Sequence, residues 1–198
     1  GLVGYSWRNN NYQDYWMQNW DFPTDDFSYN NMGAGLALKR GQAPENSIQS
    51  ENKLVGYFLR LNYNYKEKYL LMASIRHEGS SKFGKNYKWG NFPAISVGWN
   101  ATRVGFLQSF KGLSNLKLRA GFGITGTEPT DPYGSLNLIN FDIYTLVNGQ
   151  WIQVVNPALN PNPDLRWEKK EELNIGMDYG FFDNRLSGSV DYYRPTTK

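Results

Sequence analysis

The amino-acid sequence predicts an all-β fold: an antiparallel transmembrane β-barrel to which this chain contributes about seven consecutive strands. Apolar and polar residues alternate with a period of two along most of the chain, which is typical of strands with two different faces. Long and shorter connections alternate between these segments, and aromatic residues gather at the segment ends. Together these three features are typical of barrels in bacterial outer membranes.

The strand prediction depends on seven segments. From Val55 to Lys66, one phase of the alternation is apolar or aromatic and the other is mostly polar. The same pattern resumes at Tyr69, which predicts a hairpin with a short polar turn between the two segments. No segment shows a convincing helical period. The predicted strands are, in order, residues 2–7 (the weakest), 55–66, 69–78, 92–100, 116–125, 172–179 and 186–193.

The connections favour a membrane barrel because their lengths alternate. They run over residues 8–52, 66–68, 79–91, 102–115, 126–169 and 180–185. Outer-membrane barrels carry tight turns on one side of the membrane and long loops on the other. Strands of about 9–13 residues suit a tilted crossing of the hydrocarbon layer, and no run approaches the roughly 18 apolar residues of a membrane-spanning helix. Seven strands leave open edges, so we expect residues 1–198 to be part of a larger barrel.

A soluble β-sandwich that binds carbohydrate through loop aromatics is the alternative, because aromatic residues are common in strands of any kind. The two hypotheses differ in what the apolar face meets. In a barrel, Leu59, Leu61, Leu71 and Ile175 face lipid, whereas a second sheet covers them in a sandwich.

Composition and motifs argue against catalysis. The 198 residues include no Cys and one His, which excludes disulfides, a cysteine nucleophile and a multi-histidine metal centre. The net charge of +3 is only a weak indication of anionic partners, and we expect no cofactor and no nucleic acid. Residues 79–86 and 121–126 resemble nucleotide-binding loops, but neither is followed by the helix that such loops need. His77 has no identifiable nucleophile partner, and the glutamates at 168–172 define no glycosidase pair.

Two groups of side chains are candidates for contact with a solute. Charges of both signs on the predicted non-lipid face indicate a polar lumen that holds water, a plug or a solute, although a soluble sheet would expose the same face to water. Aromatic rings beside Asn, Gln and Asp in the long connections suit carbohydrate or peptide recognition. The lumen-facing set is Arg60, Arg76, Glu78, Lys117, Arg119, Glu172, Asp178 and Asp191, and the loop set is Trp16 and Trp20 within residues 12–29, together with Tyr144 and Trp151. Gly121 and Gly123 are expected on the lumenal face, where they leave room for its contents.

Three blocks of sequence resemble the SusC/RagA-type TonB-dependent outer-membrane transporters. They are YFLRLNYNYKEKYLLMASIRHEGSSKFGKNYKWGNFPAISVGWN (57–100), SNLKLRAGFGITG (114–126) and NPNPDLRWEKKEELNIGMDYGFFDNRLSGSVDYY (160–193). The blocks occur in the order expected for that family and cover most of residues 57–193, whereas residues 1–52 match it only loosely.

The resemblance implies a barrel of about 22 strands with a plug domain in its lumen. It also implies residence in the bacterial outer membrane and import of oligosaccharides or peptides beneath a SusD-like surface lipoprotein, with energy supplied through TonB. On this basis we expect residues 1–198 to be a partial barrel domain. The plug domain, the TonB-contacting region and the remaining strands are expected to lie outside it.

Overall fold

The computed structural model describes residues 1–28, 30–108, 110 and 112–198. Strands make up most of the described chain, and its helices are no longer than one turn. The strands are β1 (Leu2–Met17), β2 (Glu45–Tyr65), β3 (Tyr69–Ser80), β4 (Trp89–Asn100), β5 (Leu113–Thr127), β6 (Ile139–Val147), β7 (Gln150–Pro157), β8 (Glu168–Phe181) and β9 (Leu186–Thr197). The short helices are η1 (Asp25–Phe27), η2 (Met32–Ala34), α1 (Leu36–Lys39), η3 (Ala101–Arg103) and α2 (Gly105–Gln108).

The chain divides into two compact units. The first contains residues Gly1–Arg8 and Lys53–Lys198, and the second contains Asn9–Asn52. Strands β1 and β2 each contribute residues to both units. The first unit therefore holds the sheet and the hairpin β6–β7, and the second holds η1, η2, α1 and the distal parts of β1 and β2.

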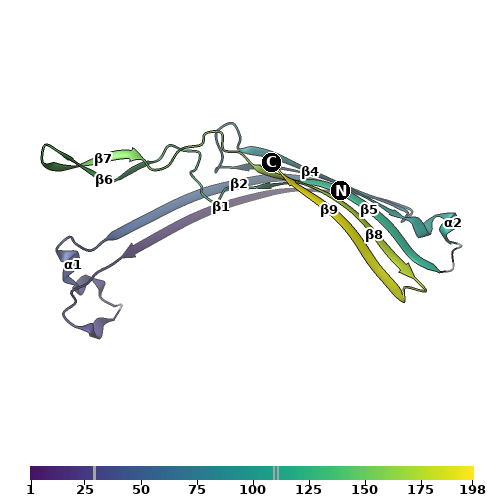
Figure 1. Ribbon diagram of the computed structural model, residues 1–198, viewed down its shortest axis with the longest axis horizontal. Coiled ribbons are helices and arrows are strands. Elements are labelled where there is room, and N and C mark those ends of the chain that lie inside the picture. The colour runs from purple at the N-terminus through teal and green to yellow at the C-terminus, as the bar shows by residue number, and fades with distance from the viewer. Residues whose placement is uncertain (29, 109, 111) are drawn as a thin grey trace. The chain divides into compact units, whose positions relative to one another are not determined.

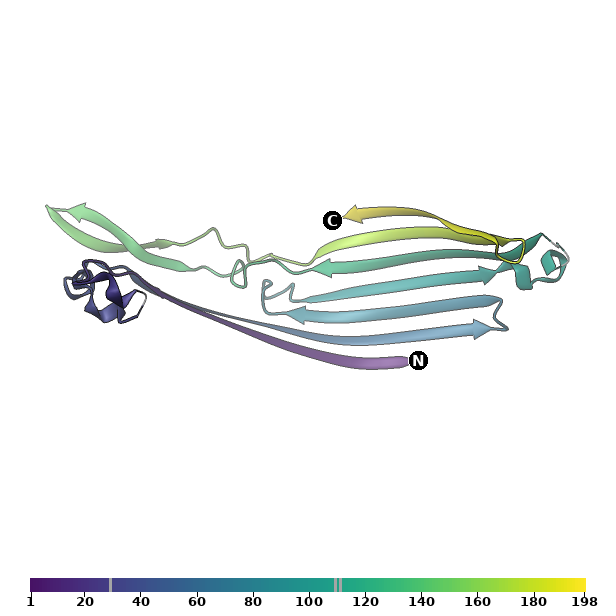
Figure 2. The ribbon, with the colours of Figure 1, turned by 90° about the horizontal axis from the view of Figure 1, so that it is seen from below.

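Seven strands form one sheet in the order β1-β2-β3-β4-β5-β8-β9. Neighbouring strands from β2 to β9 are antiparallel, and Figure 2 shows the strands of the sheet side by side. Figure 1 views the sheet of the first unit edge-on, as a single curved layer. The excursion from β5 to β8 contains a separate two-stranded sheet, β6–β7. This arrangement confirms the predicted all-β antiparallel fold, and every segment predicted to be a strand lies in one, apart from Lys66 at the end of the second.

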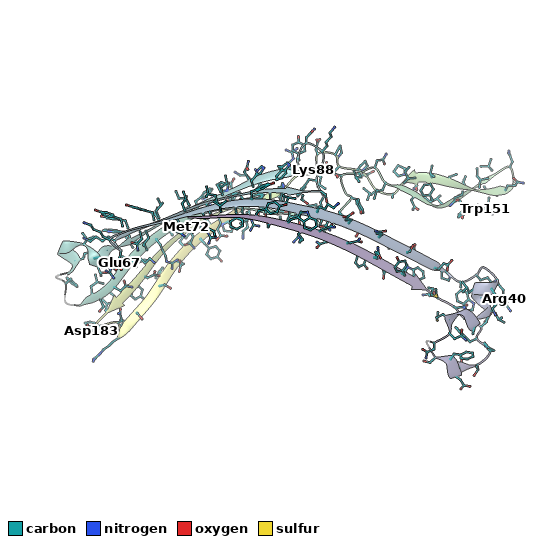
Figure 3. The ribbon with its side chains drawn as sticks, turned by 180° about the vertical axis from the view of Figure 1, so that it is seen from behind. Arg40, Glu67, Met72, Lys88, Trp151 and Asp183 are labelled. Carbon is teal, nitrogen blue, oxygen red and sulfur yellow. The ribbon has the colours of Figure 1, made fainter. Side chains whose placement is uncertain are left out.

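The short turns lie together at one end of the sheet. Glu67 in the β2–β3 turn and Asp183 in the β8–β9 turn share that end, and Lys88 lies toward the other (Figure 3). Lys66 and Glu67 have φ angles of 51° and 56°, the positive values that a tight hairpin turn with right-handed twist requires. The Lys68 amide closes the turn on the Tyr65 carbonyl at 3.0 Å.

Several details of the sequence prediction are wrong. Strand β1 continues to Met17 and strand β2 begins at Glu45, so both reach well beyond the predicted segments, and the two strands are neighbours in the sheet. Residues 139–157 form a hairpin rather than an irregular loop. The sequence contained a signal for this hairpin, because Asn148-Gly149 is a dipeptide typical of tight hairpin turns and lies between two β-prone segments. In the structure the two residues have the positive φ angles of such a turn, 50° and 80°. The link 81–88 is shorter than the link 101–112, so the predicted alternation of lengths fails there.

The apolar face of the sheet has no covering layer within the described residues. Leu59, Leu61, Leu71 and Ile175 keep 40%, 54%, 40% and 50% of their surface exposed. A sandwich would bury these side chains between two sheets, so the sandwich alternative is wrong.

No helix in the described part of the chain has both the length and the apolar character needed to span a membrane.

Candidate functional site

The eight charged residues of the predicted lumen-facing set share one face of the sheet, which we call the polar face. Arg76 lies opposite both Phe58 and Phe92, while Arg119 lies opposite both Gly98 and Gly176. Residues directly opposite each other in an antiparallel pair project to the same side, so the register connects this face across the sheet. These residues are Arg60, Arg76, Glu78, Lys117, Arg119, Glu172, Asp178 and Asp191.

The charges at the β5–β8–β9 side of the polar face form a compact group. The Arg119 guanidinium bonds both oxygens of Asp191 at 2.8 Å and donates to Asp178 Oδ1 at 3.2 Å. The bidentate contact fixes the plane of the guanidinium as well as its charge. Each of the three side chains is about one third exposed, so the group still meets solvent or a partner. On β3, further along the same face, Arg76 Nη2 donates to Glu78 Oε1 at 2.5 Å.

Two shallow depressions lie beside these charges. One, of about 550 Å³, is lined on the polar face by Asn62, Ser96, Lys117, Arg119 and Asn174. The other, of about 560 Å³, adjoins Arg60, Arg76 and Glu78. Both present hydrogen-bonding groups; the charges of the first are the cations Lys117 and Arg119, whereas the second has charges of both signs. Such linings suit water, polypeptide or a polar solute.

The two glycines expected on the lumenal face do lie on the polar face. A Cβ added at Gly121 would stand 3.5 Å from Ser96 Cβ, and one at Gly123 would stand 3.4 Å from Ala94 Cβ. Glu172, opposite Gly123 in the register, forms an ion pair with Lys170 at 3.5 Å.

Aromatic rings border the apolar face at both ends. Tyr65 and Tyr69 stack beside the β2–β3 turn, with ring centroids 6.5 Å apart. At the opposite end, Tyr57 and Trp89 stack at 6.4 Å. The stretch of β2 from Tyr57 to Tyr65 is about 27 Å long at roughly 3.4 Å per residue. That length is close to the roughly 25 Å apolar band of an outer-membrane barrel.

A buried aromatic cluster, here called the aromatic clasp, was not found from the sequence. Phe83, Phe92 and Trp167 are 1%, 6% and 6% exposed, and the Trp167 ring lies 4.6 Å from Phe83 and 5.1 Å from Phe92. Trp167 Nε1 also donates to the Lys88 carbonyl at 3.1 Å. The clasp therefore joins the β3–β4 link to the segment that enters β8.

Backbone contacts reinforce the clasp. The Gly84 amide donates to the Leu165 carbonyl at 3.0 Å, and a Cβ at Gly84 would stand 1.8 Å from the Pro163 carbonyl oxygen. Glycine is required there for close approach of two backbones. Residues 79–86, which resemble a nucleotide-binding loop in sequence, are thus partly a packing element. The signal available in the sequence was Phe83, a large apolar residue among polar ones.

The four aromatic candidates of the loop set lie in two places. Trp16 is the penultimate residue of β1, rather than part of an irregular loop, and lines a depression of about 450 Å³ with Glu45 and Asn46. Trp20 follows in the link organised by Asn19, whose side chain donates to two backbone carbonyls and accepts from the Leu38 amide. Both belong to the second unit. Tyr29, the last residue of the segment predicted there, lies outside the described residues.

Tyr144 and Trp151 lie on the hairpin β6–β7. Tyr144 is opposite Gln153, and Leu146 is opposite Trp151, so these four side chains share one hairpin face. Both rings are exposed, and Figure 3 shows Trp151 near the hairpin tip. The structure thus brings Tyr144 and Trp151 together as one aromatic surface.

The whole chain, residues 1–198, matches the family model described as TonB dependent receptor-like, beta-barrel. A TonB-dependent receptor of Formosa agariphila is 43% identical over 145 residues, which cover 73% of this chain and 14% of that protein. The TonB-dependent receptor SusC of Bacteroides thetaiotaomicron is 36% identical over 156 residues, covering 77% of this chain and 16% of SusC.

Solved structures give the same result. The chain superposes on a chain of the RagAB peptide transporter with a TM-score of 0.81 and 27% identity, covering 98% of this chain and 21% of that one. The RagAB peptide importer in its "open-open" state gives a TM-score of 0.77 and 26% identity. This chain therefore spans about a fifth or less of the length of the relatives it matches.

Proposed function

Because this chain belongs to the TonB dependent receptor-like β-barrel family, we propose that it forms part of the wall of a SusC/RagA-type transporter in the bacterial outer membrane. Residues 1–198 are then one section of a larger barrel, with the plug domain and the remaining strands outside it. The observation that carries this proposal is the two-faced single-layer sheet. An exposed apolar face between aromatic margins suits lipid, and a polar face with satisfied ion pairs suits a lumen.

In this proposal, the polar face contacts the plug, lumenal water and the passing solute. The group formed by Arg119, Asp178 and Asp191 is suited to contact with a plug because both carboxylates already pair with the guanidinium, which lowers the cost of covering them. The depression lined by Asn62, Ser96 and Asn174 offers neutral hydrogen-bonding groups to a moving solute.

We further propose the partners and solute of the full-length protein. The solute is an oligosaccharide or a peptide, received by outer aromatic residues including Trp16, Trp20, Tyr144 and Trp151, and by a SusD-like surface lipoprotein. Energy comes from TonB, through a region N-terminal to these strands. The description of RagAB as a peptide transporter supports the peptide option, while the likeness to SusC supports membership of the same transporter type. These relatives carry the names of receptors and transporters, so no catalytic role is assigned.

The face assignment is tested with adjacent residues of β4. Ser96 lies opposite Gly121 on the polar face, and Val97 lies opposite Ala120 on the apolar face. The 198 residues contain no cysteine, so Ser96→Cys and Val97→Cys are prepared in the full-length protein without other cysteines. In intact membranes, a small water-soluble thiol reagent should label Ser96→Cys and leave Val97→Cys unlabelled. Equal labelling of both, or faster labelling at Val97→Cys, would contradict the proposal.

Transport is tested by uptake. Cells that carry the full-length protein should accumulate an oligosaccharide or a peptide pool, and removing TonB should abolish that uptake. Trp151→Ala should reduce uptake if the hairpin surface receives the solute. A normal rate without TonB would exclude energised import by this protein.

A further inference from the structure

Lys117 and Arg119 are the two cations that β5 places on the polar face, and their side chains extend in opposite directions. The guanidinium carbon of Arg119 would stand 2.6 Å from a Cβ at Gly176, so the arginine reaches over β8. Lys117 Cε would stand 3.6 Å from a Cβ at Gly98, so the lysine reaches over β4 instead. Each side chain therefore passes above a neighbouring strand at a position where a glycine leaves room for it.

The nearby carboxylates are engaged by the arginine. Arg119 forms ion pairs with Asp178 at 3.2 Å and with Asp191 at 2.8 Å. Lys117 also lies opposite Asp178 in the register, yet its side chain extends toward β4, on the other side of β5. Within the described residues, the structure shows no hydrogen bond or ion pair for the Lys117 ammonium. Arg119 is thus held by two counter-charges, whereas Lys117 has none.

The surroundings of Lys117 form a site of suitable size for a small ligand. Its side chain is half-buried and lines the depression of about 550 Å³ on the polar face, a volume within the roughly 300–1,000 Å³ of small-molecule sites. Among the described residues, no Asp or Glu lines this depression. Apart from the two cations, its polar side chains are neutral, and they include Asn62, Asn64, Ser96 and Asn174.

We propose that this depression binds a carboxylate group of the transported solute, with Lys117 Nζ donating to a carboxylate oxygen. The neutral amides and the hydroxyl of the lining bond the polar atoms next to that carboxylate. The proposed solutes are peptides and oligosaccharides, and a carboxylate is an anionic group that both classes can carry. The inference rests on the proposed function, because it requires that the solute passes along the polar face, and it deepens that function by assigning an acidic solute.

Two observations favour an anion over a neutral ligand. A lysine ammonium is positively charged at neutral pH and has three donors but no acceptor, and this one lacks a counter-charge within the described residues although it is half-buried. The lining of the depression also contains no acidic side chain that would repel a carboxylate. Hydrogen bonds between an ammonium and a carboxylate are about twice as strong as those between neutral groups, so an acidic ligand is bound in preference to its neutral counterpart.

Rates of thiol labelling test the charge of the depression. Ser96→Cys, which lines it, is prepared in the full-length protein without other cysteines. It is treated with sulfonatoethyl or trimethylammonioethyl methanethiosulfonate, which have similar size and opposite charge, and each rate is divided by the rate for free cysteine. The ratio of the anionic rate to the cationic rate should fall by about tenfold in Lys117→Met, as expected for loss of one unit charge at a partly exposed site. Lys117→Arg should keep the ratio, and an unchanged ratio in Lys117→Met would overturn the proposal.

Protection from labelling tests the ligand, with an uncharged methanethiosulfonate as the reagent. Triglutamate and triglutamine, both capped at their ends, represent an acidic and a neutral peptide. Trigalacturonate and its methyl ester represent an acidic and a neutral oligosaccharide. At least one acidic probe should protect Ser96→Cys at about tenfold lower concentration than its neutral counterpart, as expected for one charge-assisted hydrogen bond, and Lys117→Met should remove the difference. The acidic probe that protects identifies the source of the carboxylate. If neither protects better than its counterpart, as when a plug carboxylate already holds Lys117, the proposal is overturned.

Lys85→Met is the matched control. It removes the same charge from the β3–β4 link, beyond the first residue of β4, whereas Lys117 lies opposite Asn100, the last residue of β4. It should leave the labelling ratio and the protection unchanged, and an effect equal to that of Lys117→Met would reduce the result to net charge and overturn the specific site. The contrast between Ser96→Cys and Val97→Cys and the dependence of uptake on TonB test the proposed function separately, so the two failures are distinguishable.

Discussion

Replacing Trp167 by alanine tests whether the aromatic clasp holds the β3–β4 link against the entry to β8. Trp167 is 6% exposed, packs on Phe83 and Phe92, and donates a hydrogen bond to the Lys88 carbonyl. Truncating a buried Trp to Ala typically costs about 3–5 kcal/mol. Because the clasp is small, we expect the loss to appear first as local opening rather than as global unfolding.

The assay is hydrogen exchange at the Gly84 amide of the full-length protein in lipid. That amide bonds to the Leu165 carbonyl at 3.0 Å and reports directly on the clasp. A loss of about 4 kcal/mol corresponds to roughly a thousandfold faster exchange, at about 1.4 kcal/mol per factor of ten. Trp167→Phe keeps most of the ring packing and loses the Nε1 donor, so it should speed exchange by only about tenfold.

Trp151→Ala is the matched control because Trp151 is 70% exposed on the hairpin β6–β7. It removes the same atoms without touching the clasp and should leave Gly84 exchange unchanged. If Trp167→Ala also left the Gly84 amide protected, the clasp would not be what fixes the link, and the reasoning would be refuted.

Two further predictions concern close packing and the membrane face. Gly84→Ala places a Cβ where the Pro163 carbonyl oxygen now lies 1.8 Å away, so it should abolish protection of the residue 84 amide in the same exchange experiment. Gly121→Ala, with its nearest neighbour at 3.5 Å, should leave that protection intact, and equal effects would argue against steric exclusion at position 84. Ile175→Lys puts a charge on the apolar face and should lower the free energy of unfolding in vesicles by about 2–4 kcal/mol, as measured by urea titration. Asn174→Lys, on the polar face opposite Gly121, should lower the free energy of unfolding by less than about 1 kcal/mol. A similar loss for both variants would mean that the apolar face does not meet lipid while the polar face meets water.

The strands were predictable because their signal is local. In β2, Tyr57, Leu59 and Leu61 alternate with Phe58, Arg60 and Asn62, and a strand turns alternate residues to opposite faces wherever it lies. The same periodicity predicted that the charges of β3, β5, β8 and β9 share a face. It did not predict which charges pair, because the approach of Arg119 to Asp178 and Asp191 depends on β8 lying beside β5 and on β9 lying beside β8.

Irregular segments were less predictable. The hairpin β6–β7 has a local signal in Asn148-Gly149, but a polar and aromatic sequence around it resembles a loop. The extension of β1 to Met17 has no amphipathic signal, because residues 8–14 are almost all polar. Trp16 and Trp20 are close in sequence, yet Trp16 lies within strand β1 and Trp20 lies in the following link, beside Asn19.

The sequence by itself determined the two-faced character of this chain, since alternation of side chains along a strand is a property of neighbouring residues. Its aromatic strand ends and its short turns likewise follow from local chemistry. Tertiary structure alone decided that Trp167 reaches Lys88 across 79 positions, and that His77 stacks on Trp89 from the neighbouring strand. Both arrangements form only when distant strands and links fold side by side, and no local pattern specifies that pairing.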